Sequence, residues 1–201
     1  MRNANRQVGW LCGRRFFVLI AGFLCGALLA LPASSLGQAK DSSPVAPPAP
    51  HTLTGELEPL AYFEGSWSCD GVFVGSGKPI ASNLGFSAEL EGAWLTVHSD
   101  DVPPNRFHAR ELWGFDKKAK QFSNFIFDNF GGARLFTSPG WEGDKLIWTG
   151  GAIANTAPPD QRFIFQKASP EEMVVSWEVR KPQGDWVVGD RLTCRKLKTL
   201  P

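Results

Sequence analysis

Between residues 66 and 196, hydrophobic residues repeatedly alternate with polar or small ones, the pattern of β-strands that bury one face. Short breaks rich in Gly, Pro, Asn and Asp separate these runs, as expected for the turns of hairpins. No stretch with the period of an ordinary helix interrupts them. The pattern predicts ten strands, at residues 66–74, 80–90, 93–102, 107–115, 121–127, 133–138, 146–154, 161–168, 173–180 and 186–196.

An even number of strands joined by short turns favours a single closed, antiparallel, up-and-down β-barrel, because closure leaves no unpaired strand edge. A sandwich of two sheets is the alternative. Before the first strand, residues 53–64 predict one or two helical turns, in which Pro59 suits the first turn and Gly65 ends the helix. We expect these turns to cover one end of the barrel, within one domain that spans residues 53–201.

The first 39 residues have the layout of a secretory signal peptide. Residues 1–15 contain four arginines and no acid, residues 16–31 are apolar, and residues 32–39 are mostly small. The apolar run is shorter than the roughly 20 residues that span a bilayer as a helix. Residues 40–52 contain four prolines and predict a disordered linker. We therefore expect an exported protein, periplasmic or extracellular, without an integral membrane span in the mature chain.

Charge adds a restriction on partners. Removal of the signal peptide takes away four of the 21 basic residues and none of the 20 acids, which leaves a net charge of about −3. Such a chain lacks the basic field that attracts nucleic acids or anionic membrane surfaces, and we expect neither as a partner. The sequence carries no signal for an oligomeric state.

Two cysteines remain in the predicted mature chain, Cys69 in the first strand and Cys194 in the last. In an exported domain this pair predicts a disulfide, which would fasten the first strand to the last one. The alternative is two separate buried thiols. Neither cysteine has a histidine or a second cysteine nearby, so we expect no metal site.

Glu111 is the sharpest candidate for chemistry, because it falls on the same strand face as Trp113. If that face is buried, the carboxylate is desolvated and its pKa rises. It could then orient the polar group of a ligand or act as an acid or base. The alternative is a structural carboxylate paired with Arg110 or Arg134, or one in water at the barrel mouth.

Asp190 is a second carboxylate on a face that we expect to be buried, since it alternates in phase with Cys194. We expect it to pair with Arg191, Arg195 or a neighbour on the adjacent strand rather than to act in catalysis, and we assign no catalytic residue.

Four tryptophans are candidates for lining a ligand cavity, because such cavities are mostly apolar and aromatic. They are Trp94, Trp113, Trp148 and Trp177. The alternative is that they fill the barrel, as side chains do in small barrels.

Gly65-Ser66-Trp67 follows the helical turns, and the last strand carries an arginine, Arg191 or Arg195. This arrangement resembles the signature of lipocalins and other calycins. The tryptophan there closes one barrel end beneath the arginine, so the resemblance implies structural roles for these residues.

The span 57–197 is similar to a bacterial family known only as domain of unknown function fifteen-seventy-nine. The similarity lies in four stretches that occur in order, at residues 60–67, 90–95, 112–116 and 141–149. It implies a calycin-like barrel and carries no established chemistry.

The nitrobindins, which are related by fold, hold haem through a histidine on a late strand. The histidines of this domain are His98 and His108, both expected on the outer face, and none follows. We therefore expect no haem and no other cofactor.

The leading hypothesis is an exported barrel that binds a small apolar or amphipathic molecule. One alternative is a small-molecule isomerase or hydrolase that uses the buried carboxylate of Glu111. The other is an envelope protein-interaction module with a solid barrel. A cavity with Glu111 in its wall would separate the first two hypotheses from the third.

Overall fold

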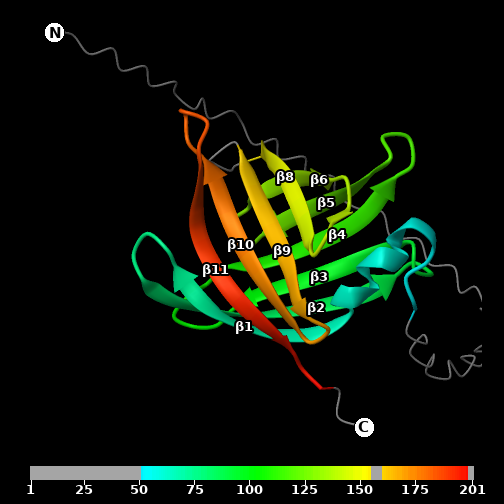
Figure 1. Ribbon diagram of the computed structural model, residues 1–201, viewed down its shortest axis with the longest axis horizontal. Coiled ribbons are helices and arrows are strands. Elements are labelled where there is room, and N and C mark those ends of the chain that lie inside the picture. Colours follow the sequence, from blue (N-terminus) through cyan, green and yellow to red (C-terminus); the bar gives the residue numbers. More distant parts are fainter. Residues whose placement is uncertain (1–50, 155–159, 199–201) are drawn as a thin grey trace, which may run out of the picture. The chain divides into compact units, whose positions relative to one another are not determined.

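The computed structural model describes residues 51–154 and 160–198. The predicted signal peptide, nearly all of the predicted linker and residues 155–159, between the seventh and eighth predicted strands, lie outside these residues. One 3-10 helix precedes an all-β domain (Figure 1). The elements are η1 (Gly55–Phe63), β1 (Gly65–Phe73), β2 (Lys78–Glu89), β3 (Trp94–Asp101), β4 (His108–Asp116), β5 (Gln121–Asp128), β6 (Ala133–Ser138), β7 (Trp141–Glu142), β8 (Lys145–Ala154), β9 (Gln161–Ser169), β10 (Glu172–Arg180) and β11 (Trp186–Lys196).

The ten long strands form one closed antiparallel ring. Strands β1 to β6 pair in sequence order, β8 to β11 do the same, and the ring is completed by β1 with β11 and by β6 with β8. The two-residue strand β7 pairs only with β8. This arrangement confirms the predicted barrel and excludes the two-sheet sandwich.

The alternation in the sequence sets which side chains enter the barrel. On β3, Leu95 and Val97 are buried, whereas Thr96 is partly exposed and His98 is exposed. The same two-residue period recurs on β1, β2 and β5, because successive side chains of a strand point to opposite faces.

Strands β1 and β11 meet in a close seam. Cys69 lies directly opposite Cys194, and their sulfur atoms form a disulfide of 2.05 Å, as the sequence predicts. Two residues further along β1, Gly71 lies against the backbone of β11. A Cβ there would be 2.0 Å from the carbonyl oxygen of Arg191, so the seam requires glycine at this position.

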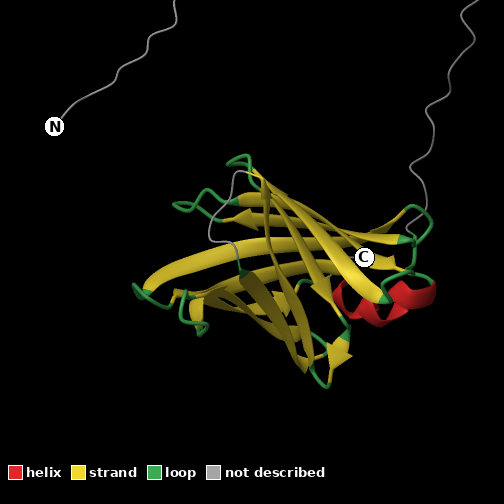
Figure 2. Cartoon of the chain, turned by 90° about the horizontal axis from the view of Figure 1, so that it is seen from above, coloured by secondary structure: helices red, strands yellow, loops and turns green. Residues whose placement is uncertain are grey.

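Helix η1 covers one end of the strands, as Figure 2 shows from above. The predicted helical turns are therefore confirmed, in the tighter 3-10 form and with Pro59 inside. Gly65 follows the helix at φ +107°, a conformation that favours glycine, and begins β1.

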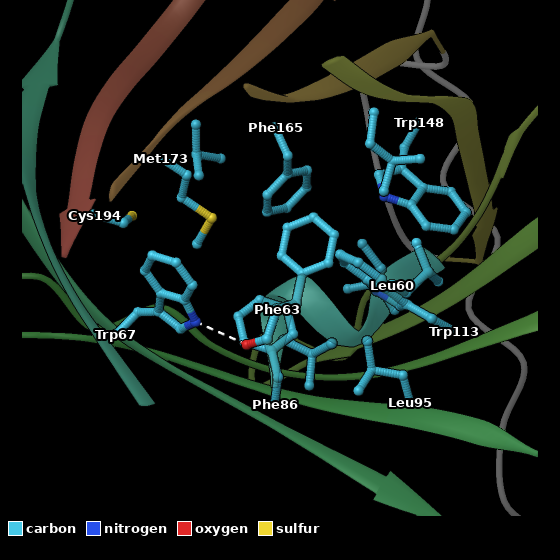
Figure 3. Packing of buried hydrophobic residues seen from close by; sticks show 14 of the residues in the cluster. Leu60, Phe63, Trp67, Phe86, Leu95, Trp113, Trp148, Phe165, Met173 and Cys194 are labelled. Carbon is cyan, nitrogen blue, oxygen red and sulfur yellow. Dashed lines mark hydrogen bonds between the residues drawn. The ribbon is translucent and has the colours of Figure 1, made fainter. Parts of the chain in front are cut away.

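Phe63, at the end of η1, is the centre of the aromatic core (Figure 3). Its ring lies 5.2 Å from that of Trp113, 5.3 Å from Phe86 and 5.5 Å from Phe165, measured between centroids. The indole Nε1 of Trp67 donates a hydrogen bond of 2.8 Å to the carbonyl oxygen of Phe63. Such contacts fill this half of the barrel with side chains.

The cation over Trp67 is Lys196 rather than an arginine. Its Nζ lies 5.2 Å from the ring centroid and donates to the carbonyl oxygen of Tyr62 at 3.1 Å. Arg191 and Arg195 are exposed, because odd-numbered residues in this part of β11 point outward, whereas Lys196 shares the face of Cys194. The resemblance implied that Arg191 or Arg195 covers Trp67, and this prediction is wrong because Lys196 occupies that position.

In the part of the chain that the structure describes, no helix combines the length and apolarity that crossing a bilayer requires.

Replacing both bridged cysteines (Cys69→Ala with Cys194→Ala) should lower the free energy of unfolding by about 4–5 kcal/mol, because the disulfide closes a very long loop. Denaturant unfolding with and without reductant measures this change. The reductant should destabilise the wild type and leave the double variant unaffected. A wild-type transition that does not move on reduction would contradict the role of the disulfide.

Candidate ligand-binding cavity

A cavity of about 360 Å³ lies inside the barrel, on the side of the aromatic core away from η1. Phe73 from the end of β1, Asp101 from the end of β3 and Phe107 before β4 line it at the far end of the barrel. Towards the core it reaches Phe165 and the disulfide. Most of the residues that line it are aromatic or aliphatic, so the cavity suits an apolar molecule.

Glu111, on β4, points into this cavity, as its alternation with outward-facing neighbours predicts. Trp113 Nε1 and Asn124 Nδ2 each donate a hydrogen bond of 2.8 Å to its Oε2 atom. Burial raises the pKa of Glu111, although these two hydrogen bonds and the charge of Arg134 act in the opposite direction. The side chain is thus a desolvated and oriented carboxylate.

The arginines considered as partners of Glu111 are bound elsewhere. Arg134 Nη1 lies 2.6 Å from the carboxylate of Asp128, and Arg110 Nη1 lies 3.0 Å from that of Asp100 on the outer face. Among the described residues, Glu111 therefore has no ion-pair partner.

Asn124 belongs to the site although sequence reasoning missed it. It lies on β5 between the buried residues Phe122 and Ile126, and only 1% of its surface is exposed. Its Nδ2 atom binds Glu111, whereas its Oδ1 atom has no hydrogen-bond partner among the described residues. The sequence signal was a polar residue that alternates in step with buried apolar residues of the same strand. In the structure, this residue leaves an unused hydrogen-bond acceptor in the cavity wall.

Asp190, on β11, also lines the cavity, and the expectation that it pairs with Arg191 or Arg195 is wrong. Its pKa is raised to about 6, mainly by burial and also by the negative charge of Asp101, although a hydrogen bond from the backbone of Trp177 acts in the opposite direction. The two arginines point outward, so neither can neutralise a carboxylate on the inner face.

A β-bulge places Trp177 beside Asp190. Trp177 pairs with Asp190 and the next residue, Glu178, pairs with Val188, which leaves Gly189 as the extra residue of β11. A Cβ at Gly189 would be 2.3 Å from the indole ring, so the glycine lets the ring lie on the β11 backbone. Trp177 Nε1 donates to Gln161 Oε1 at 2.9 Å.

Of the four tryptophans named from the sequence, Trp177 lines the cavity and the others lie elsewhere. Trp113 and Trp148 are fully buried in the adjoining core, with ring centroids 4.9 Å apart. Trp94 packs over Gly114 on the outer face, where a Cβ would be 2.5 Å from its ring. The prediction that Trp94 lines the cavity is therefore wrong. The next residue, Leu95, is buried, so Trp94 points to the outer face of the strand.

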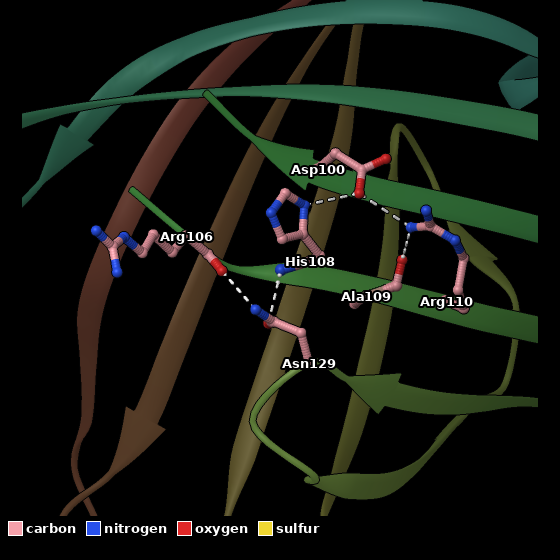
Figure 4. A network of polar contacts seen from close by, with 6 residues as sticks. All are labelled: Asp100, Arg106, His108, Ala109, Arg110 and Asn129. Carbon is pink, nitrogen blue, oxygen red and sulfur yellow. Dashed lines mark hydrogen bonds and ion pairs between the residues drawn. The ribbon is translucent and has the colours of Figure 1, made fainter. Parts of the chain in front are cut away.

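Both domain histidines are on the outside of the barrel, as predicted. His108 Nδ1 and Arg110 Nη1 contact the same oxygen of Asp100, at 2.9 and 3.0 Å (Figure 4). Asn129 accepts a hydrogen bond of 3.0 Å from the backbone N–H of His108 and donates one of 2.7 Å to the carbonyl oxygen of Arg106. This network fastens the β3–β4 and β5–β6 connections together.

Within the described ranges, 51–154 and 160–198, no group of three or more His, Cys, Asp or Glu residues is placed to hold a metal ion.

The fold and the cavity define the class of protein: a closed ten-stranded antiparallel β-barrel with an internal, mainly apolar cavity. A similar solved structure is the crystal structure of Rv2717c from M. tuberculosis, with a TM-score of 0.55 and 12% sequence identity over 73% of this chain and 99% of that chain. At that identity the likeness shows the fold alone. Neither a protein-family model nor a curated protein matches the sequence, so the family resemblance drawn from its motifs stays a prediction.

Asp190→Asn should stabilise the protein at neutral pH. The ordinary pKa of this carboxyl is 3.8 and its folded-state pKa is about 6. Between these values the unfolded chain gives up the proton first, so the wild type loses stability as the pH rises. The amide removes this loss, and the variant should be more stable at pH 7 by about 2–3 kcal/mol, with little difference near pH 3.

Urea unfolding at several pH values measures the effect. The control is Asp70→Asn, which removes an exposed carboxylate from β1 and should not reproduce the pH-dependent gain. Equal stability of the wild type and Asp190→Asn at neutral pH would contradict the desolvation of Asp190.

Proposed function

We propose that this chain binds a small apolar or amphipathic molecule inside its barrel, without covalent chemistry. The observation that carries the proposal is the cavity of about 360 Å³, which lies within the range of about 300–1,000 Å³ usual for small-molecule sites. Its aromatic and aliphatic wall would bury the apolar part of a ligand, and the few polar groups in it would orient the rest.

The cavity argues against the interaction-module alternative, which requires a solid barrel. A module that recognised partners only through its outer face would gain stability from an interior filled by side chains, as the half of the barrel around Phe63 is filled. The unfilled half is better explained by an occupant.

The enzyme alternative has one observation in its favour, the oriented and desolvated carboxylate of Glu111. A general acid or base needs a pKa near the working pH, and burial moves this group in that direction. Native mass spectrometry of protein from its source, followed by incubation of any recovered ligand with the wild type and Glu111→Gln, tests it. A product formed only by the wild type would support catalysis, and an unchanged ligand would support binding.

We also propose that the protein is exported to an oxidising compartment. The disulfide between Cys69 and Cys194 supports this proposal, because such bonds are rare where thiols are kept reduced. The N-terminal residue of protein isolated from its source tests it. A start near residue 38 or 40 is expected, and an intact Met1 would contradict removal of the leader.

A bulkier residue in the cavity wall should prevent binding. Val175 lines the cavity, and its neighbour Val174 is on the opposite face of β10. We expect Val175→Phe to weaken binding of the neutral probe octanol by about tenfold or more, since it occupies the ligand's space, and Val174→Phe to leave it unchanged.

Calorimetry and the fluorescence of Trp177, which lines the cavity, report this binding. Circular dichroism checks that both variants are folded. Equal loss of binding in the two variants, or none in either, would place the octanol site outside the cavity.

A further inference from the structure

The charged groups of the cavity are mostly acidic. Three carboxylates line it, those of Asp101, Glu111 and Asp190, and none has an ion-pair partner among the described residues. The lining contains one cation, Arg134, which is bound to Asp128 at 2.6 Å. The apolar chamber therefore has an excess of negative charge that the protein itself does not neutralise.

The surroundings of the carboxylates are equally short of cations. Asp101 and Asp190 line the same cavity, and the negative charge of Asp101 disfavours the ionised form of Asp190. His108 favours the ionised form of Asp101 electrostatically, but it is already bound to Asp100. The hydroxyl of Ser82 acts in the same direction and carries no charge. Arg134 acts on Glu111 but is paired with Asp128.

A second observation points to the same kind of ligand. Asn124 is 1% exposed and lines the cavity, and its Oδ1 atom has no hydrogen-bond partner. The two hydrogen bonds that Glu111 accepts from Trp113 and Asn124 both end on Oε2, which leaves its Oε1 atom available to a ligand. These atoms are acceptors, and unused acceptors in a buried wall are best satisfied by a ligand that brings donors.

We infer that the ligand of this cavity is a lipophilic amine, with a protonated nitrogen held by the carboxylates of Asp101 and Asp190 and an apolar body against the aromatic wall. This inference rests on the proposed function, because it names the class of molecule that the same cavity takes. An ammonium group supplies both a positive charge for the three carboxylates that have no ion-pair partner and several N–H donors for the unused acceptors.

An anionic amphiphile is the competing ligand, because Arg134 Nε is buried without a hydrogen-bond partner. Its guanidinium charge, however, is already matched by Asp128, and a carboxylate ligand would meet three further carboxylates in a cavity of low polarity. The balance of charge favours the amine.

The test compares three probes of the same chain length: octylamine, octanol and octanoate. Calorimetric titration of the full chain at pH 8 should give the tightest binding for octylamine and the weakest for octanoate. The double variant Asp101→Asn with Asp190→Asn should weaken octylamine binding by about tenfold or more and octanol binding much less, because octanol carries no charge. The control Asp70→Asn removes an exposed carboxylate of β1 and should change neither.

Each contrary result has a distinct meaning. If octanol binds and octylamine binds no better, the proposed function stands and the amine inference is wrong. If octanoate binds most tightly, Arg134 is the anchor and the inference is likewise overturned. If none of the three probes binds, the proposed function itself fails, and the inference fails with it.

Discussion

The seam between β1 and β11 is the contact on which the rest of the structure depends. Every other strand pair except β6–β8 joins neighbours along the chain, whereas this one joins its two ends. The disulfide between Cys69 and Cys194 links strands 125 residues apart, and Gly71 allows their backbones to approach closely. Without the seam the sheet would have two long free edges, no enclosed interior and no cavity.

Closure fixes the interior, and helix η1 then divides it. The ring of ten strands encloses more space than the aromatic side chains fill. Phe63 enters from the helix and gathers rings from several strands around it, so that half of the barrel becomes a packed core. The other half receives no such plug among the described residues, and the cavity lies there. The position of the cavity therefore follows from the placement of a single helix.

The sequence was sufficient for features that depend on the two-residue period alone. The ten long strands and the inward direction of Glu111 follow from alternation and from the position of turns, and the pairing of Cys69 with Cys194 follows from their being the two cysteines of the domain. The same rule, applied strictly, also identifies Lys196 as an inward-facing residue two positions after Cys194. The tryptophan-and-arginine signature obscured that simpler inference.

Other features depend on contacts that alternation cannot supply. The bulge at Gly189 sets Trp177 against Asp190, and the two-residue period alone does not show which residue is skipped. The missing cation beside Asp190 is a property of the assembled ring, because it depends on which way the side chains of several distant strands point. The sequence shows Asn124 as a polar residue in step with buried apolar ones. That its Oδ1 atom is unused becomes evident only from the structure, in which its Nδ2 atom donates to Glu111.

The cavity carboxylates are the part of the structure that stability alone does not explain. Burial raises the pKa of Asp101, Glu111 and Asp190, which means that the folded protein holds each ionised form at a cost. An apolar side chain of similar size at any of these positions would remove that cost and fill part of the chamber. Proteins keep such unfavourable groups mainly where binding or catalysis uses them. Because the cost here falls on three acids that share one apolar chamber, a ligand that neutralises them would return stability to the fold on binding.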